Sequence, residues 1–483
     1  MPKKKTESRA GRGPLRAAPP RVVILAAGIG SRMRSSVPKV LHRVGGRTML
    51  DAVLETAESV SPSSIVAVLG SGREQVAATL RGRPVATVVQ DPPRGTGDAV
   101  RAALAALGDG DDGPVLVLSG DAPLLTTATL SSLLARQRDG NLDLAFLSFR
   151  PPEAADFGRV VRDRAGRVKR VVEFRNATVA ERKLGEVNAG VYCFRGKALA
   201  PAIQKLKPNP VNGEYYLTDT IGTLAGRAGK VEAIEAEDWR EAWGINTRRD
   251  LAAAEEIERR RTVERALDGG ATLLDPTTIR IGPHVTLEPD AVIHPFVSLE
   301  GRTAIGEGCE VLPYTRIADS TVAARSVIGP HCDVEGAKIG ERVRVGPFAR
   351  IRPESVLEED VRVGNFVETK KAILRKGTKA LHLAYLGDVE VGAGANIGAG
   401  VITCNYDGEK KHATVIGEGA FIGSDSQLVA PVTVGAGAYV GAGSTVTQDV
   451  PDGALALSRT PQENVEGWAE KRKERRESTR NKT

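Results

Sequence analysis

The chain has 483 residues, which exceeds the size at which a single core stops growing, so two or more domains are expected. Hydrophobic residues make up 41% and charged residues 26% of the sequence, as in ordinary globular proteins, and no apolar run approaches the length of a membrane span. The net charge of +7 does not indicate a nucleic-acid binder, because it resides in two basic ends: residues 1–20 carry six Lys or Arg against one acidic residue, and residues 468–483 carry seven against three.

Both charged ends are expected to be disordered. Residues 1–20 also lack the apolar segment of a signal peptide. The four cysteines are widely spaced and include no CxxC pair, so neither a zinc site nor a disulfide framework is expected, and a reducing cytoplasm is favoured. They are Cys193, Cys309, Cys332 and Cys404.

From residue 21 to about 247, strand-like runs alternate with helical runs. This rhythm is typical of an α/β domain with a mostly parallel sheet and helices on both faces. The expected strands are 22–26, 65–69, 85–89, 115–118 and 142–149, and the expected helices are 50–59, 74–80, 98–107 and 124–136.

The first expected strand runs into the string LAAGIGSRM (residues 25–33), followed by Pro38 and Lys39. Small residues after a strand let backbone N–H groups approach a phosphate or a base, and Arg32 and Lys39 add positive charge. The spacing fits neither a Walker A loop nor a GxGxxG dinucleotide site, so a plain tight turn remains an alternative.

Residues 248–267 contain no Gly or Pro and predict a connecting helix, which Gly269 and Gly270 end. From residue 281 to residue 446 an aliphatic residue then returns every sixth position, a period that predicts a parallel β-helix with an internal aliphatic column. The three ladders are Ile281, Leu287, Ile293, Leu299, Ile305, Val311, Ile317; Ile339, Val345, Ile351, Leu357, Val363; and Ile416, Ile422, Leu428, Val434, Val440, Val446.

Polar residues accumulate where this repeat is interrupted, around His382, and the chain leaves the coils between Cys404 and about Thr414. A lone histidine is most often structural, and a β-helix often serves only as a scaffold. A histidine near Glu368, Lys370 and Tyr385 is suited to general-base work instead.

Several motifs occur together and in order: LAAGIGSRM with Pro38-Lys39, Gln90 with Gly95-Thr96-Gly97, Ser119-Gly120-Asp121, Glu173, Val187-Asn188-Ala189-Gly190 and Gly244-Ile245-Asn246. This series resembles the sugar-nucleotide pyrophosphorylases, although Asp98 stands where that family commonly has His. Joined to the hexapeptide array, it resembles the bifunctional N-acetylglucosamine-1-phosphate uridyltransferase/glucosamine-1-phosphate acetyltransferase family of bacterial cell-wall precursor synthesis over residues 20–465. The resemblance implies a Rossmann-like nucleotidyltransferase domain followed by a left-handed parallel β-helix of hexapeptide repeats.

The resemblance also implies the roles of residues in the first domain. Asp121 and Asn246 would hold Mg²⁺, a hard ion suited to oxygen ligands, while Arg32 and Lys39 would act in catalysis by neutralising the triphosphate of UTP. The implied nucleotide and sugar contacts are Leu25, Ala26, Ala27, Gly28, Lys39, Gln90, Gly95, Thr96, Ser119, Gly120, Asp121, Gly158, Glu173, Asn188 and Asn246.

In the β-helix, the resemblance makes His382 the general base that takes a proton from the amino group of glucosamine 1-phosphate as acetyl-CoA is attacked. The implied sugar-phosphate contacts are Arg352, Lys370, Tyr385, Asn396 and Asn405. The implied acetyl-CoA contacts are Ala399, Asn405, Tyr406, Ser424, Ala442 and Arg459.

The expected domains are a tail (1–20), a nucleotidyltransferase domain (21–247), a linker helix (248–270), an acetyltransferase β-helix (271–460) and a charged tail (461–483). The resemblance implies a homotrimer. One alternative is a single-activity sugar-nucleotide pyrophosphorylase with a non-catalytic β-helix. Another is a non-catalytic scaffold or RNA-associated protein that relies on its basic tails.

Overall fold

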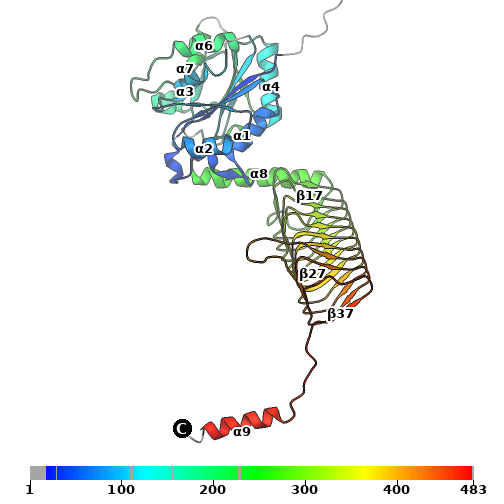
Figure 1. The fold of residues 1–483 in the computed structure, drawn as a ribbon. Coiled ribbons are helices and arrows are strands. Elements are labelled where there is room, and N and C mark those ends of the chain that lie inside the picture. The colour runs from blue at the N-terminus through cyan, green and yellow to red at the C-terminus, as the bar shows by residue number, and fades with distance from the viewer. Residues whose placement is uncertain (1–17, 29, 109–111, 155, 227–229, 481–483) are drawn as a thin grey trace, which may run out of the picture. The chain divides into compact units, whose positions relative to one another are not determined.

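A computed structural model describes residues 18–28, 30–108, 112–154, 156–226 and 230–480 (Figure 1). The chain divides into two compact units at residues 260 and 261, within helix α8 (Arg248–Asp268). Most of the N-terminal tail that we expected to be disordered, residues 1–17, lies outside the described residues.

The first unit is built on a nine-stranded sheet whose main path runs β11-β7-β10-β6-β1-β4-β5. Strand β10 pairs antiparallel with both β6 and β7, and the other neighbours on this path are parallel. The main path is therefore mostly parallel, as predicted, and off this path β8 pairs antiparallel with β10 and with β9. Its strands are β1 (Arg21–Ala26), β4 (Ser64–Leu69), β5 (Ala86–Val89), β6 (Pro114–Ser119), β7 (Leu144–Phe149), β8 (Arg159–Arg162), β9 (Val168–Val172), β10 (Val187–Arg195) and β11 (Val231–Glu235), and a separate hairpin joins β2 (Arg43–Val44) to β3 (Arg47–Thr48).

Helices cover both faces of the sheet, because successive residues of each buried strand point to opposite sides. Val22 and Ile24 of β1 join one core with residues of α1 and α4, and Val23 joins the other with residues of α3, α6 and α7. The helices are α1 (Met49–Glu58), α2 (Arg73–Leu80), α3 (Thr96–Ala103), α4 (Thr127–Asp139), α5 (Val179–Arg182), α6 (Gly196–Gln204) and α7 (Asp219–Ala225).

The second unit contains a parallel β-helix of very short strands, shown as a stack of coils in Figure 1. Each coil has three strands, so most strands pair in parallel with the third strand along the chain. The bounds are β12 (Thr272–Leu273), β13 (Arg280–Ile281), β14 (Thr286–Leu287), β15 (Val292–Ile293), β16 (Ser298–Glu300), β17 (Ala304–Ile305), β18 (Glu310–Val311), β19 (Arg316–Ala318), β20 (Thr321–Val322), β21 (Val327–Ile328), β22 (Asp333–Glu335), β23 (Lys338–Ile339), β24 (Arg344–Val345), β25 (Arg350–Ile351), β26 (Val356–Leu357), β27 (Arg362–Leu374), β28 (Lys379–Val391), β29 (Asn396–Ile397), β30 (Ile402–Cys404), β31 (Thr414–Ile416), β32 (Phe421–Ile422), β33 (Gln427–Val429), β34 (Val432–Val434), β35 (Tyr439–Val440), β36 (Thr445–Val446) and β37 (Leu455–Ala456).

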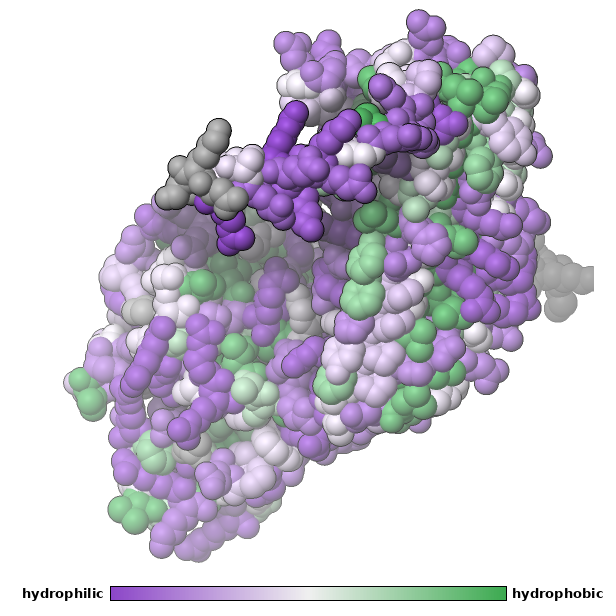
Figure 2. Space-filling view, turned by 90° about the horizontal axis from the view of Figure 1, so that it is seen from below, coloured by the Kyte–Doolittle hydropathy of each residue, from purple (hydrophilic) through white to green (hydrophobic). Residues whose placement is uncertain are grey.

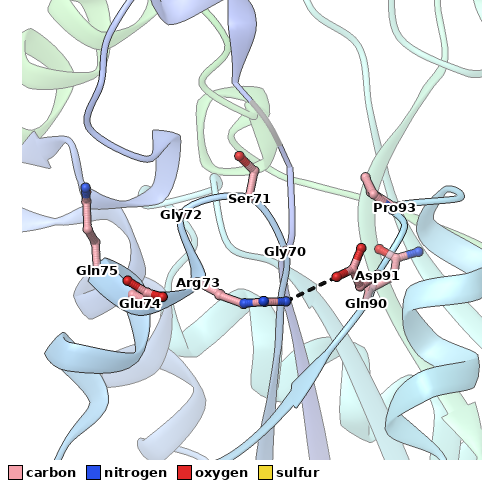
Figure 3. Close-up of a pocket in the computed structure, with 9 residues that line it drawn as sticks. All are labelled: Gly70, Ser71, Gly72, Arg73, Glu74, Gln75, Gln90, Asp91 and Pro93. Carbon is pink, nitrogen blue, oxygen red and sulfur yellow. Dashed lines mark hydrogen bonds and ion pairs between the residues drawn. The ribbon is translucent and has the colours of Figure 1, made fainter.

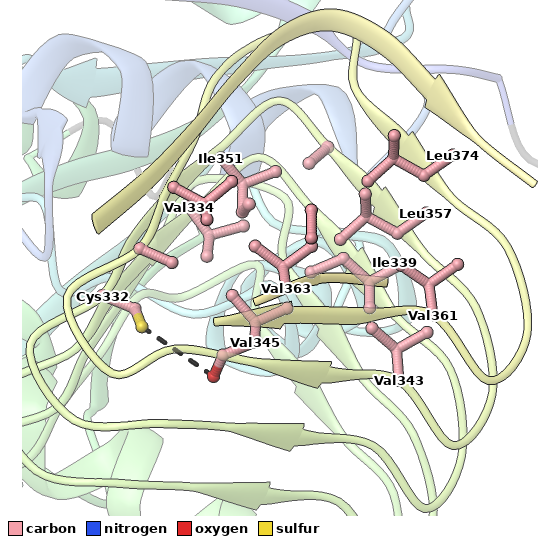
Figure 4. Close-up of a cluster of buried hydrophobic side chains, with 14 of the residues drawn as sticks. Cys332, Val334, Ile339, Val343, Val345, Ile351, Leu357, Val361, Val363 and Leu374 are labelled. Atoms are coloured by element: carbon pink, nitrogen blue, oxygen red, sulfur yellow. Dashed lines mark hydrogen bonds between the residues drawn. The ribbon is translucent and has the colours of Figure 1, made fainter. Parts of the chain in front are cut away.

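The predicted aliphatic column fills the interior of these coils. Ile281, Leu299 and Ile317 stack in successive coils, with exposed fractions of 7%, 0% and 0%. Figure 4 shows the aliphatic side chains of later coils gathered inside the turns of the chain. The six-residue period thus identified the buried positions of this unit.

The break that the sequence shows between the first two ladders has a simple cause. Residue 299 pairs with residue 317, 18 positions on, but residue 317 pairs with residue 334, 17 positions on. The next coil is also one residue short, since residue 334 pairs with residue 351, 17 positions on. Val322, Ile328 and Val334 therefore continue the buried column out of the six-residue phase.

A second irregularity is an insertion into one coil. Residue 391 pairs with residue 416, 25 positions on, so the coil holds several residues more than its neighbours. The extra residues leave the stack as a loop, in which Tyr406 and Lys411 form a short antiparallel bridge. This is the excursion that the sequence predicted.

The C-terminal basic segment differs from the disorder we expected. Residues Trp468–Arg480 form helix α9, in which every side chain is exposed. Glu, Lys and Arg are strong helix formers, so this segment forms a helix without packing against a core. None of the helices in the described part of the chain is long and apolar enough to cross a bilayer. Figure 2 shows a mostly hydrophilic face with small, separate hydrophobic groups.

Candidate functional sites

The first candidate site lies where β1, β5 and β6 end. Parallel strands bring their carboxyl ends to one edge of a sheet, which is where α/β proteins bind ligands. A pocket of about 420 Å³ opens there. Its lining residues are Leu25, Ala27, Gly28, Gly30, Ser31, Arg32, Lys39, Val40, Gln90, Pro93, Gly95, Thr96, Ala99, Ser119, Asp121, Glu214 and Asn246.

Most of the residues predicted for nucleotide binding line this pocket, and two lie behind it. The side chain of Ala26 is buried in the core of the sheet. Gly120 donates its backbone N–H to Leu25 O, and a Cβ at Gly120 would lie 2.9 Å from that oxygen, so only glycine allows this approach. Arg32 lines the pocket with an exposed side chain that lies 3.9 Å from Asp156.

Three predicted residues that are far apart in the sequence meet at one point of the pocket. The Lys39 ammonium donates hydrogen bonds to Asp121 Oδ2 and, at 2.7 Å, to Asn246 Oδ1. Burial raises the pKa of Asp121, but the Lys39 ammonium and the hydrogen bonds from Lys39 and Ser119 outweigh burial and hold the pKa below its ordinary value. Asp121 is therefore a carboxylate at neutral pH.

This arrangement fits a hard divalent cation. The carboxylate of Asp121 and the amide oxygen of Asn246 already share one cationic group, and Asn246 Nδ2 donates to Gly244 O, which turns Oδ1 toward Lys39. Oxygen donors of this kind are the ligands that Mg²⁺ prefers, with phosphate and water completing its shell.

The residues predicted to hold the sugar form a cluster beside the pocket. Asn188 N donates to Gly158 O at 2.9 Å, and a Cβ at Gly158 would lie 3.6 Å from Glu173 Oε2. Burial raises the pKa of Glu173, and the hydrogen bond from Thr218 opposes this only in part. Asn188 Oδ1 is buried and has no hydrogen-bond partner among the described residues, so it is available to a donor on a ligand.

The second candidate site lies on the β-helix, where β27 and β28 run side by side for 13 residues each. Their register places Asn365 beside His382, and His382 Nδ1 lies 3.1 Å from Asn365 Oδ1. Because an amide oxygen can only accept, Nδ1 carries the hydrogen, and the lone pair of Nε2 is left to take a proton. The sequence analysis did not single out Asn365, although it lies 17 positions before His382, one coil earlier.

Three cations gather at β27, the strand that pairs with the strand of His382. Lys411, in the excursion loop, lies against the Lys370 ammonium and lowers the pKa of Lys370, and Arg352 adds to the effect. Arg352 also pairs with Glu368 at 2.7 Å. Like charges gather in this way where an anion is bound. Lys411 was missed by the sequence analysis, because nothing in its spacing relates it to Lys370.

The side chains of Tyr385 and Asn405 both lie against the backbone of Gly387. A Cβ at Gly387 would lie 2.5 Å from the Tyr385 hydroxyl and 2.8 Å from Asn405 Nδ2, so a side chain at this position would displace both groups. Asn405 is buried and donates to Asp388 Oδ2 at 2.5 Å. The remaining residue predicted to contact the sugar phosphate, Asn396, begins β29 and pairs with Lys379 of β28.

The residues predicted for acetyl-CoA follow one corner of the later coils. Ala399 O accepts from Asp425 N at 2.7 Å, Ser424 O accepts from Gly443 N at 2.8 Å, and Ala442 O accepts from Arg459 Nη1 at 2.9 Å. This column continues toward the C-terminal coils from the His382 region. Tyr406 is exposed in the excursion loop, and its hydroxyl donates to Gly408 O.

Comparisons with known proteins match both units. Residues 22–209 match the MobA-like NTP transferase domain, residues 281–382 the GMPPB C-terminal domain, and residues 413–448 the bacterial transferase hexapeptide (six repeats). These matches confirm the expected fold class.

Proteins named bifunctional protein GlmU are similar along nearly the whole chain. That of Anaeromyxobacter sp. (strain Fw109-5) is 48% identical over 93% of this chain and 92% of its own length. That of Sorangium cellulosum (strain So ce56) is 46% identical over 94% and 96%. That of Streptomyces coelicolor is 44% identical over 94% and 95%.

Proposed function

The chain belongs to the family of bifunctional GlmU proteins, and from this membership and the two sites we propose how it carries out two reactions. It is a glucosamine-1-phosphate acetyltransferase and a UDP-N-acetylglucosamine pyrophosphorylase. Acetyl transfer makes N-acetylglucosamine 1-phosphate, and uridylyl transfer then makes UDP-N-acetylglucosamine and releases pyrophosphate.

In the first unit, a phosphate oxygen of the sugar 1-phosphate attacks the α-phosphorus of UTP, and the bond to pyrophosphate breaks. Positioning and charge neutralisation supply most of the rate in such reactions. Lys39 and Arg32 would neutralise the phosphates, Gln90, Gly95 and Thr96 would bind the uracil, and the pocket at the sheet edge supports these roles.

The cluster of Gly158, Glu173 and Asn188 would hold the acetamido sugar, because its buried oxygens can accept hydrogen bonds from hydroxyl and amide groups. Asp121 and Asn246 would hold Mg²⁺, which supplies positive charge to the phosphates when bound. Lys39 then has the phosphates as alternative partners to the Asp121 carboxylate.

In the second unit, the amino nitrogen of glucosamine 1-phosphate attacks the thioester carbon of acetyl-CoA. A C–N bond forms, the C–S bond breaks, and His382 Nε2 takes the proton from the nitrogen and returns it to the departing sulfur, so that CoA leaves as a thiol. Asn365 would keep the imidazole in the required tautomer. Arg352 and Lys370, joined by Lys411, would bind the sugar phosphate, while Tyr385, Asn396 and Asn405 would orient the sugar.

Acetyl-CoA would lie along the corner formed by Ala399, Ser424, Ala442 and Arg459, with Asn405 and Tyr406 beside it. His382 itself is exposed between Leu381 and Leu383, whose exposed fractions are 39% and 61%. Apolar side chains exposed around a reacting group favour a neighbouring subunit that covers them, and we propose a homotrimer. The four free cysteines support a place in a reducing cytoplasm.

One observation carries the bifunctional assignment over a pyrophosphorylase with an inert β-helix: Asn365 orients His382 on the strand that pairs with β27, the strand where Lys370 lies against Lys411. The test supplies glucosamine 1-phosphate and acetyl-CoA without UTP and measures free thiol, and then supplies N-acetylglucosamine 1-phosphate and UTP and measures pyrophosphate. We expect both products. Pyrophosphate without thiol would leave the single-activity alternative standing.

A further inference from the structure

Gln90 is the most deeply buried polar side chain in the lining of the first pocket. It directly follows β5 and has an exposed fraction of 5%. Its amide nitrogen donates to Gly95 O at 2.9 Å and to Asp98 Oδ2 at 3.1 Å. Within the described residues, no group donates a hydrogen bond to its amide oxygen, Oε1.

These two hydrogen bonds fix which way the amide faces. A backbone carbonyl and a carboxylate can only accept, so both require the nitrogen of Gln90. Turning the amide by half a turn would place Oε1 against two other oxygens. Gln90 also borders an adjoining pocket of about 520 Å³, where Figure 3 draws it beside Asp91 and Pro93 and across from the loop at Gly70. Because Gln90 borders two pockets, hydrogen bonding rather than close packing sets the orientation of its amide.

Asp98 is itself held in place. It lies in the first turn of α3 with an exposed fraction of 8%. Arg101 lies 3.3 Å from its Oδ1 and Arg94 3.6 Å from its Oδ2. The carboxylate is thus a rigid acceptor behind Gln90.

The fixed orientation of the Gln90 amide bears on which nucleobase the pocket can bind. The backbone N–H groups of Gly95 and Thr96 lie at the start of α3, where a helix leaves its first N–H groups without partners. Both residues line the pocket together with Gln90, so the same pocket offers these donors and the Gln90 Oε1 acceptor. Uracil presents an acceptor, O4, next to a donor, N3–H. Cytosine presents the reverse, an amino donor next to the N3 acceptor.

We propose that Asp98 is a positioning residue that makes the pocket select uracil over cytosine, by holding Gln90 with its oxygen toward the base. The proposal rests on the proposed function of this pocket as the UTP site. Asp98 is not among the residues that line the pocket, and it acts through Gln90.

The test compares kcat/KM for UTP and for CTP in the full-length protein, by pyrophosphate release with N-acetylglucosamine 1-phosphate. We expect Asp98→Leu and Asp98→Ala to lower the UTP-to-CTP ratio about tenfold, the worth of one hydrogen bond to a charged group. Asp98→Asn keeps an oxygen acceptor and should retain the ratio within about twofold. Arg101→Met removes an ion pair of Asp98 and leaves Gln90 untouched, so it should also retain the ratio within about twofold. The ratio does not depend on the fraction of folded enzyme, because both nucleotides report on the same active molecules.

A double-mutant cycle separates positioning from a general structural effect. In a Gln90→Ala background, Asp98→Leu should change the ratio no further. An equal effect of Asp98→Leu with and without Gln90 would overturn the proposal, as would an unchanged ratio in Asp98→Leu or an equal loss in Arg101→Met. Wild-type protein that uses UTP and CTP equally would overturn this inference and leave the proposed function intact. Wild-type protein that releases no pyrophosphate from UTP would overturn the proposed function itself.

Discussion

The two candidate sites are built in opposite ways. In the first unit, Lys39, Asp121 and Asn246 come from three distant segments and meet in a partly enclosed pocket at the edge of a sheet. In the second unit, Asn365 and His382 come from adjacent coils and lie on an open surface, placed by strand register alone.

This difference determines what each site depends on. Burial makes the first site sensitive to charge, as the opposing effects of burial and Lys39 on the Asp121 pKa show. Register makes the second site sensitive to backbone fit, since a side chain at Gly387 would overlap Tyr385 and Asn405. Substitutions that change charge should therefore affect the first site most. Substitutions that add bulk should affect the coils most.

The largest effect should follow from removing the buried charge. We expect Asp121→Asn to reduce uridylyl transfer about 10³-fold, because it removes the carboxylate that faces Lys39 and the proposed metal. Acetyl transfer in the same protein should not change. Asp91→Asn is the matched control, since Asp91 is 70% exposed and pairs with Arg73 at the surface. A comparable loss of both activities would contradict the separation of the two sites.

A smaller effect should follow from removing the hydrogen bond that holds the His382 imidazole. Asn365→Ala removes the acceptor for His382 Nδ1, and we expect kcat for acetyl transfer to fall about 10- to 100-fold. Asn365→Asp keeps an acceptor and should recover most of this loss, with the pH profile moved upward because a carboxylate raises the pKa of a neighbouring imidazole. An unchanged rate in Asn365→Ala would show that the tautomer is held by something else.

Backbone fit in the coils can be tested by unfolding, with a variant that lies beside the second site and far along the chain from the first. A Cβ at Gly364 would lie 1.9 Å from Leu381 O, so Gly364→Ala should destabilise the β-helix by about 1–3 kcal/mol. Gly282→Ala is the control, because a Cβ there would lie 3.4 Å from its nearest neighbour, Leu299 O, which is an ordinary contact. Calorimetry should detect a lower unfolding temperature for the unit that contains the coils, while uridylyl transfer keeps its thermal tolerance. Equal shifts in both variants would contradict the steric account.

The smallest effect concerns pH and the buried Glu173. Its folded-state pKa lies above the ordinary value of 4.5, so ionisation opposes folding at neutral pH. Below pH 4.5 Glu173 is protonated in both the folded and the unfolded protein, so its contribution to stability is fully present. That contribution is lost as pH rises through the raised pKa. Glu173→Gln should therefore raise the unfolding temperature at pH 7, and the gain should disappear as pH falls toward 4.5. A gain that grows on acidification would contradict the sign of this shift.

The repeat architecture could be read from the sequence because its period is fixed by geometry. Ile281, Leu299 and Ile317 are buried where the six-residue spacing predicts. The buried column between Ile317 and Ile339 was not predicted, because two coils that are each one residue shorter move the buried positions out of phase without any change in composition. The antiparallel strand β10 was also not anticipated, since strand direction leaves no mark in the pattern of hydrophobic residues.

The sites could be predicted only in part from residue chemistry. Lys39 and Asp121 are 82 positions apart, and no spacing rule joins them to Asn246, so their meeting was expected from family resemblance alone. Lys411 depends on where the excursion loop folds back, and Asn365 on a register that the ladder did not carry through the interrupted coils. The hydrogen bond from Gln90 to Asp98 is a side-chain orientation, which the sequence does not show.

The most direct test of two independent sites compares His382→Ala with Lys39→Ala in the full-length protein. Each variant receives glucosamine 1-phosphate with acetyl-CoA in one assay and N-acetylglucosamine 1-phosphate with UTP and Mg²⁺ in another. We predict that His382→Ala loses thiol release at least about 100-fold and keeps pyrophosphate release, and that Lys39→Ala does the reverse. Loss of both activities in either variant, or thiol release that survives in His382→Ala, would contradict the account.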